Sequence, residues 1–194
     1  MRILKPLKLM FLCLLLQACK QPVDWHANDI TGLMPDLVFS LAGPLGEQID
    51  ANTLHGKLVV LFFGFTHCPD TCPTTLTQLS VIRKNLGVQA DGVHFVLVSV
   101  DPERDTPAIM QRYSASFGPW LLGLTGTEAA LKKLRDAYGV YAAMESSTSK
   151  GNYNVMHSTA VFVFDTHGKA RLLMTDIQAT DTVVADLRNL IEQN

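Results

Sequence analysis

The chain has 194 residues, of which 47% are hydrophobic and 18% charged, and its formal net charge is −2 at pH 7. This length and composition predict one globular domain and exclude a disordered, collagen-like or repetitive chain. The first 18 residues carry three basic groups and no acidic ones, so without them the net charge falls from −2 to −5. A mildly acidic surface without a basic stripe argues against binding to nucleic acid.

The N-terminus has the pattern of an export signal. Residues 1–18 combine a basic start with an apolar run over Leu9–Leu16, which is shorter than the about 20 residues that span a bilayer. The run ends in Gln17-Ala18-Cys19, which resembles a bacterial lipoprotein box. We therefore expect a signal peptide over residues 1–18, acylation of Cys19 and an irregular, lipid-anchored linker over residues 19–34. The alternatives are a plain signal peptide or a short buried helix with a chance cysteine.

A lipid on Cys19 would anchor the domain to a membrane of the bacterial cell envelope, facing the periplasm. Lys20 follows the cysteine, where an aspartate often marks retention in the inner membrane of Gram-negative bacteria. The choice between inner and outer membrane therefore stays open.

Beyond residue 34, apolar strands alternate with amphipathic helices. The expected elements, in chain order, are a hairpin over Leu37–Leu41 and Glu47–Ile49, a buried strand over Lys57–Phe63, a helix over Pro73–Leu86, a strand over His94–Val100, a helix over Pro107–Phe117, a strand over Leu121–Leu124, a helix over Glu128–Tyr138, a hairpin over Ser158–Phe164 and Ala170–Thr175, and a helix over Asp181–Glu192. Thr106 and Thr127 are the expected N-caps, and Gly87 is an expected C-cap. This order predicts an α/β domain over residues 35–194, with a mixed central sheet, flanking helices and an N-terminal hairpin extension.

Two cysteines remain in the predicted mature domain, Cys68 and Cys72, because Cys13 leaves with the signal and Cys19 takes the lipid. They follow the first long strand, which is a thioredoxin-like placement. Pro69 keeps Cys68 out of a regular helix and leaves Cys72 at the helix entrance, where free backbone N–H groups favour a thiolate. A disulfide that closes so short a ring adds little stability. The pair is therefore predicted to be redox-active or to bind a metal.

A third metal ligand has to come from elsewhere in the chain, and His157 is the candidate. It opens the predicted strand Ser158–Phe164, whose start lies beside the cysteine loop in a thioredoxin-like sheet. The simpler alternative is a hydrogen-bonded surface histidine. His67 adjoins Cys68 too closely to bind the same ion easily, so we expect it to support the ligands from beside them.

Four blocks of sequence, in this order, resemble the Sco/SenC family: FTHCPDTCP over Phe65–Pro73, SVDPERDTP over Ser99–Pro107, GLTGT over Gly123–Thr127 and MHSTAVFVFD over Met156–Asp165. The resemblance runs from Pro35 to the C-terminus. It implies a thioredoxin-like fold, copper bound by two cysteines and a histidine, and a role in maturing the CuA centre of cytochrome c oxidase. By position, those ligands are Cys68, Cys72 and His157.

The resemblance also places Asp101 near the site, where it would orient His157 or tune the surroundings of the metal. The alternative for Asp101 is an ordinary turn residue before Pro102.

Two thiolates and one imidazole form a set of soft ligands that suits Cu(I), whereas Cu(II) needs further ligands and zinc is the alternative metal. We predict a monomeric metallochaperone that delivers copper to subunit II of cytochrome c oxidase or to another cuproprotein. One alternative is an enzyme, a thiol–disulfide reductase that uses Cys68 and Cys72 as its redox pair to keep the client's cysteines reduced. A second alternative is a sensor of copper or redox state.

Overall fold

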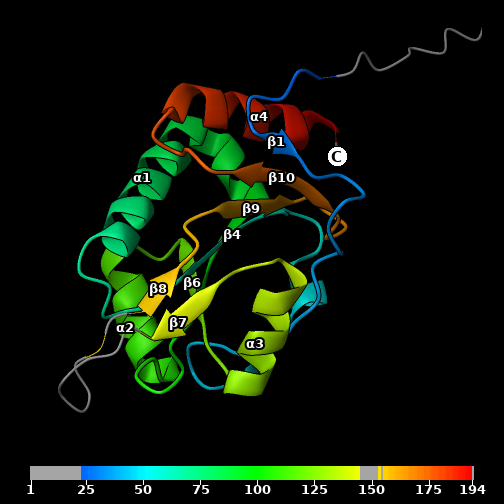
Figure 1. The fold of residues 1–194 in the computed structure, drawn as a ribbon. Helices are drawn as coiled ribbons and strands as arrows, with labels where there is room; N and C mark the ends of the chain where they lie inside the picture. Colours follow the sequence, from blue (N-terminus) through cyan, green and yellow to red (C-terminus); the bar gives the residue numbers. More distant parts are fainter. Residues whose placement is uncertain (1–22, 145–152, 154, 194) are drawn as a thin grey trace, which may run out of the picture.

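The computed structural model describes residues 23–144, 153 and 155–193, and the fold is a mixed sheet between helices (Figure 1). The central sheet has six strands in the order β1-β10-β9-β4-β5-β6. These strands are β1 (Asn28–Asp29), β4 (Leu58–Gly64), β5 (Val93–Ser99), β6 (Leu121–Leu124), β9 (Val161–Phe164) and β10 (Ala170–Met174). β4, β5 and β6 are parallel, whereas β9, β10 and β1 are joined by antiparallel pairings. The predicted thioredoxin-like α/β fold with a mixed sheet is confirmed.

Two small antiparallel ribbons lie outside the central sheet. The first joins β2 (Ser40–Ala42) to β3 (Gln48–Asp50), which confirms the predicted N-terminal hairpin. The second joins β7 (Ala142–Met144) to β8 (Val155–His157), and this ribbon was not predicted.

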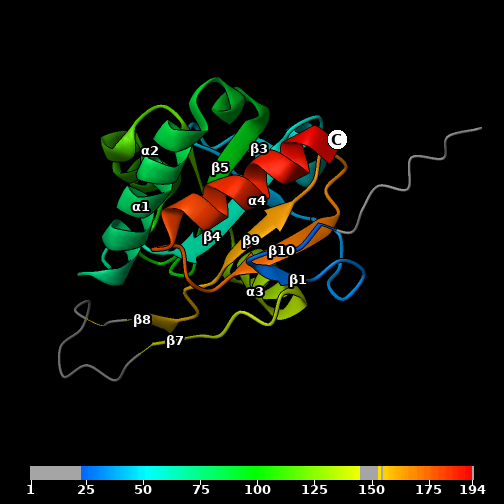
Figure 2. The same ribbon diagram turned by 90° about the horizontal axis from the view of Figure 1, so that it is seen from above.

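Four α-helices and two short 3₁₀ helices complete the described part of the chain. They are η1 (Ala51–Leu54), α1 (Thr71–Leu86), η2 (Gly87–Gly92), α2 (Pro107–Phe117), α3 (Glu128–Ala137) and α4 (Thr180–Gln193). α1 and α4 lie side by side on one face of the sheet, and α3 covers the opposite face (Figures 1 and 2). The sheet is therefore covered on both sides, as its apolar central strands require.

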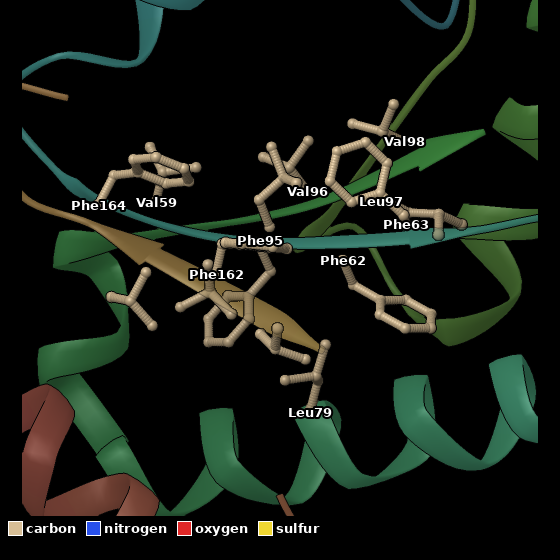
Figure 3. Close-up of a cluster of buried hydrophobic side chains, with 14 of the residues drawn as sticks. Val59, Phe62, Phe63, Leu79, Phe95, Val96, Leu97, Val98, Phe162 and Phe164 are labelled. Carbon is tan, nitrogen blue, oxygen red and sulfur yellow. The ribbon is translucent and has the colours of Figure 1, made fainter. Parts of the chain in front are cut away.

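The centre of the core is built on β4 and β5. All seven residues of β4 are buried, which explains why its sequence is a continuous apolar run without alternation. Figure 3 shows Phe62 on the side of the sheet that faces α1, together with Leu79 of that helix, and Phe164 on the other side. Burial of each such large side chain contributes about 2–3 kcal/mol of hydrophobic stabilisation.

The ends of the helices follow the local sequence. Thr106 caps α2 by accepting a hydrogen bond from the N–H of Ile109, and Thr127 caps α3 in the same way through Ala130, as predicted. Gly87 follows α1 with a φ of 61°, a left-handed value that suits glycine. α1 begins two residues earlier than expected, at Thr71, so that Cys72 lies within its first turn.

The segment that we predicted to be an irregular linker up to residue 34 is in part folded onto the domain. β1 pairs with β10, and Ile30 is 5% exposed. The buried carboxylate of Asp186 on α4 accepts hydrogen bonds from the backbone N–H groups of His26 and Ala27. The prediction of an irregular segment was wrong here, because a two-residue strand of polar residues leaves no apolar pattern in the sequence.

The predicted signal peptide over residues 1–18 and the predicted acylation site Cys19 lie outside the described residues. Among the residues that the structure does describe, no helix is both long and apolar enough to span a membrane.

Candidate metal centre

The two cysteines lie where β4 ends and α1 begins. Asp70 is the N-cap residue of α1, and Cys72 in its first turn is completely buried. Cys68 lies in the preceding loop and is partly buried, and its Sγ accepts a hydrogen bond of 3.3 Å from the backbone N–H of Cys72. Both side chains are free thiols. One sulfur is therefore fixed inside the core and the other lies at its edge.

His157 lies 85 residues after Cys72 in the sequence and contacts the cysteine loop from a different segment. It is the last residue of β8, and its Nε2 lies 3.3 Å from Sγ of Cys72. Its ring is packed edge-on against the rings of Phe62 and Phe65, with centroid distances of 6.0 and 5.7 Å. The expected strand Ser158–Phe164 was wrong in its boundary, because β9 begins only at Val161. The histidine therefore belongs to the small β7–β8 ribbon instead of opening the central strand.

The three predicted ligands form one cluster. The ligand atoms of Cys68, Cys72 and His157 all lie within 4.8 Å of one another. Beside them is a cavity of about 190 Å³, lined by Cys68, His157 and Met156 among others. Two sulfurs and one imidazole nitrogen at this spacing form a site that can hold a soft metal ion.

The protonation of the ligands follows from their burial. Burial, together with the side-chain interaction with the neighbouring Cys68 thiol, raises the pKa of Cys72, and the thiol is therefore protonated in the metal-free protein. The sequence-based expectation of a thiolate at the helix entrance was wrong for this state, because loss of hydration outweighs the helix dipole. A metal ion that binds Cys72 has to displace this proton.

Burial lowers the pKa of His157, against an opposing hydrogen bond to Ser158, and so favours the neutral imidazole. Nδ1 lies 2.8 Å from the carbonyl oxygen of Ser158, which can only accept, so Nδ1 carries the proton. Nε2, which faces Cys72, keeps its lone pair. This is the tautomer that a metal-binding histidine needs.

Asp105 is a residue of the site that sequence reasoning missed. Its carboxylate is completely buried and accepts hydrogen bonds from the Thr66 hydroxyl at 2.6 Å and the Ser99 hydroxyl at 2.7 Å. It also accepts from the backbone N–H of Thr66, at 3.2 Å. Asp105 thus fixes the chain two residues before Cys68. The only signal in the sequence was the second aspartate of the SVDPERDTP block.

The two predicted supporting residues occupy different places. Asp101 is 2% exposed and binds Arg104 and the Tyr153 hydroxyl, the latter at 2.6 Å. It makes no direct bond to the imidazole of His157, whose Nδ1 is bound to Ser158 and whose Nε2 faces Cys72. His67 is exposed, and its Nδ1 lies 3.0 Å from the Thr66 hydroxyl.

The family model for SCO1/SenC matches residues 35–192 of this chain. The chain belongs to the SCO1/SenC family. A SCO2-like protein of Rickettsia felis is 36% identical over 132 residues, which are 68% of this chain and 64% of the relative. The match thus spans slightly less than two thirds of that relative's length.

Solved structures of Sco proteins have the same fold. The structure of ScoI from Bradyrhizobium japonicum with copper bound is 36% identical, with a TM-score of 0.73, over 80% of this chain and 98% of that one. The solution structure of apo Sco1 from Thermus thermophilus is 37% identical, with a TM-score of 0.76, over 88% of this chain and 99% of that one. Both metal-bound and metal-free Sco proteins are therefore similar in fold to this chain.

Proposed function

We propose that this chain binds copper through Cys68, Cys72 and His157 and delivers it to the CuA centre in subunit II of cytochrome c oxidase, or to another cuproprotein. The observation that carries the proposal is the cluster itself, with three soft or borderline donor atoms within 4.8 Å. Copper-bound structures of Sco relatives support the choice of metal. Copper is the cargo here, and the chain acts as a metallochaperone.

The donor set fits Cu(I) on chemical grounds. Thiolate sulfur and neutral imidazole nitrogen are its preferred ligands, and three of them suffice for trigonal coordination. Cys72 is completely buried, which excludes water from one side of a bound ion, whereas Cys68 and His157 border the open cavity. A client's ligands can approach from that cavity and replace those of the chain one at a time.

The first test is a titration of the reduced chain with Cu(I) against a competing chelator. We expect one ion per chain, and a loss of affinity greater than about hundredfold in His157→Ala, because even the groups that only orient ligands contribute 10- to 100-fold. His55→Ala is the matched control, since His55 is an exposed histidine outside the cluster. Equal affinities in the parent and in His157→Ala would contradict the proposal.

Delivery needs a second test. The copper-loaded chain is mixed with the metal-free soluble domain of subunit II, and formation of the CuA centre is followed by its visible absorption. We expect the centre to form faster from the loaded chain than from the same total copper mixed with His157→Ala, which binds copper too weakly to carry it. A centre that forms equally fast from free copper would contradict delivery by this chain.

The alternative function is thiol–disulfide reduction, favoured by the partial exposure of Cys68 beside the cavity. The Cys68 thiolate would attack a client disulfide and release one client thiolate. Cys72 would then attack the mixed disulfide and release the second, leaving the client reduced and this pair oxidised. His157→Ala separates the two functions, because the reductase needs only the two thiols and should retain its activity in that variant.

We also propose that the chain is anchored in the bacterial envelope by a lipid on Cys19, on the strength of the sequence before it. Metabolic labelling with a fatty acid should mark the parent and not the Cys19→Ser variant. Labelling of both chains would contradict the anchor.

A further inference from the structure

Arg104 joins three parts of the chain around the metal centre. Its side chain is only 14% exposed, although it carries a permanent charge. Nε donates to the carboxylate of Asp101, and Nη1 donates to the carbonyl oxygen of Tyr153 at 2.8 Å. The guanidinium also lies over the ring of Tyr153, 3.6 Å from its centroid, and 5.7 Å from the centroid of Phe65.

These partners belong to both halves of the ligand set. Phe65 precedes Cys68 by three residues, and its carbonyl oxygen accepts a hydrogen bond of 3.3 Å from the backbone N–H of Cys68. The ring of Phe65 meets that of His157 at an angle of 85°. Tyr153 precedes His157 by four residues, and its hydroxyl donates to the same Asp101 that binds Arg104. Arg104 therefore contacts the chain that leads into the cysteine loop and the chain that leads into the histidine strand.

The strand that carries His157 depends on such contacts because its own pairing is weak. β8 has three residues, pairs only with the equally short β7 and lies outside the central sheet (Figure 2). Isolated two-stranded ribbons are marginally stable in water. The guanidinium of Arg104 adds stability to the ribbon, because its planar group stacks on a ring and donates hydrogen bonds in fixed directions at the same time.

We propose that Arg104 is a positioning residue that holds His157 at binding distance from the two thiols, by clamping Tyr153 and Phe65 to Asp101. This rests on the proposed function, since the quantity that Arg104 controls is the affinity for copper. Arg104 does not touch the ion. It acts through the ribbon and through the aromatic wall against which the imidazole packs.

The test measures Cu(I) affinity of the full, reduced chain by chelator competition. Arg104→Ala is expected to weaken binding by about 10- to 100-fold, the range found for groups that orient metal ligands. In the double variant Arg104→Ala/His157→Ala, the affinity should equal that of His157→Ala, because Arg104 acts only through that ligand. Independent, additive losses would overturn the proposal.

Arg171 provides a matched control at the far edge of the sheet. It also lies over an aromatic ring, Trp25 at 5.9 Å, and faces a carboxylate, Asp165 at 3.7 Å. Arg171→Ala should lower the melting temperature of the metal-free chain and leave the copper affinity within about twofold of the parent. A similar loss of affinity in both variants would show a general effect of stability and overturn the clamp.

Two further variants keep the test decisive if Arg104→Ala folds poorly. Arg104→Lys retains the charge but not the planar, stacking fork, so we expect it to bind copper nearly as weakly as Arg104→Ala. Tyr153→Leu removes the stacked ring and leaves the ion pair with Asp101, and it should weaken copper in the same direction. Parent-like affinity in either variant would overturn the proposal.

A spectroscopic readout separates positioning from folding. The thiolate-to-Cu(II) absorption of the loaded chain should shift in Arg104→Ala toward that of His157→Ala, and remain unchanged in Arg171→Ala. If the parent itself holds no copper, the proposed function fails. If the parent holds copper through His157 and the Arg104 variants match it, only the clamp fails.

Discussion

The two halves of the metal centre are built in opposite ways. Cys68 and Cys72 lie four positions apart in one continuous segment, which runs from the fully buried strand β4 into the 16-residue helix α1. His157 comes from 85 residues further along and ends a three-residue strand outside the central sheet. The thiols thus belong to segments of the main core, whereas the imidazole is carried by a short ribbon outside the central sheet and only packs against the core at Phe62 and Phe65.

This difference indicates which metal ligand can be displaced without disruption of the fold. Displacing a sulfur means moving β4 or α1, which would disrupt close packing in the core. Displacing the imidazole means moving only the β7–β8 ribbon, together with the ring contacts of His157 to Phe62 and Phe65 and its hydrogen bond to Ser158. Copper affinity and fold stability should therefore respond very differently to changes in the two halves.

The largest expected effect is the loss of the buried thiol. Cys72→Ser replaces a soft ligand by a hard one and should weaken Cu(I) binding by more than about hundredfold. It should also lower the free energy of unfolding by about 1–3 kcal/mol, because a hydroxyl takes the place of a fully buried sulfur. Chelator competition and urea unfolding measure the two quantities. In His157→Ala, by contrast, affinity should fall with less effect on unfolding; equal stability losses in the two variants would break the comparison.

A larger side chain beside Cys72 should lower both the stability of the fold and the affinity for copper. A Cβ at Gly64 would lie 3.1 Å from Sγ of Cys72 and 3.0 Å from Cε1 of Phe62. Gly64→Ala should therefore lower the free energy of unfolding by about 1–3 kcal/mol and weaken copper binding by displacing the sulfur. Gly92→Ala is the control, since a Cβ there meets nothing within 4 Å. Unchanged stability in Gly64→Ala would contradict the rigid packing described here.

The buried carboxylate behind the cysteine loop should give a pH signature. Burial raises the pKa of Asp105 above its ordinary value of 3.8. Its contribution to stability is therefore fully present below pH 3.8 and is lost as the pH rises through the raised pKa. Asp105→Asn should remove this part of the pH dependence. Urea unfolding across the acid range measures it.

Asp136→Asn, at a carboxylate with 61% side-chain exposure on α3, is the control for that experiment. If Asp105→Asn kept the pH profile of the parent, the carboxylate would not be titrating as its burial requires.

The smallest effect is expected at His67. This exposed histidine interacts only with the Thr66 hydroxyl among the contacts described for it. His67→Ala should change the copper affinity by no more than about twofold, as is usual for surface substitutions. A larger change, measured by the same chelator competition, would mean that His67 supports the ligands after all.

The sequence was sufficient for the elements that carry a strong local pattern. The apolar run Lys57–Phe63 predicts the buried strand β4. Pro107 and Gly87 mark helix ends by their conformational limits, and Thr127 does so by the hydrogen bond that its side chain accepts. The cysteine loop and the choice of His157 came from spacing and from the Sco/SenC resemblance. The structure brings all three residues together.

What the sequence could not provide depends on contacts between distant segments. The strand β1 has two polar residues, and its pairing is decided by β10 and Asp186 more than by its own propensity. The β7–β8 ribbon is equally short, so no periodicity marks it. The protonated state of Cys72 was missed because burial is a property of the whole fold, whereas the helix dipole is visible locally.

The long separation of His157 from the cysteines has a consequence for the unfolded chain. Without the fold, two thiolates four positions apart can still chelate an ion, but a histidine 85 residues from Cys72 joins them only at the cost of closing a large loop. By chain statistics, that closure costs about 4–5 kcal/mol, against about 2 kcal/mol for the cysteine ring alone. Any ion bound by all three groups therefore prefers the native chain over the denatured one chiefly through the histidine. Copper binding should therefore raise the melting temperature of the chain mainly through His157.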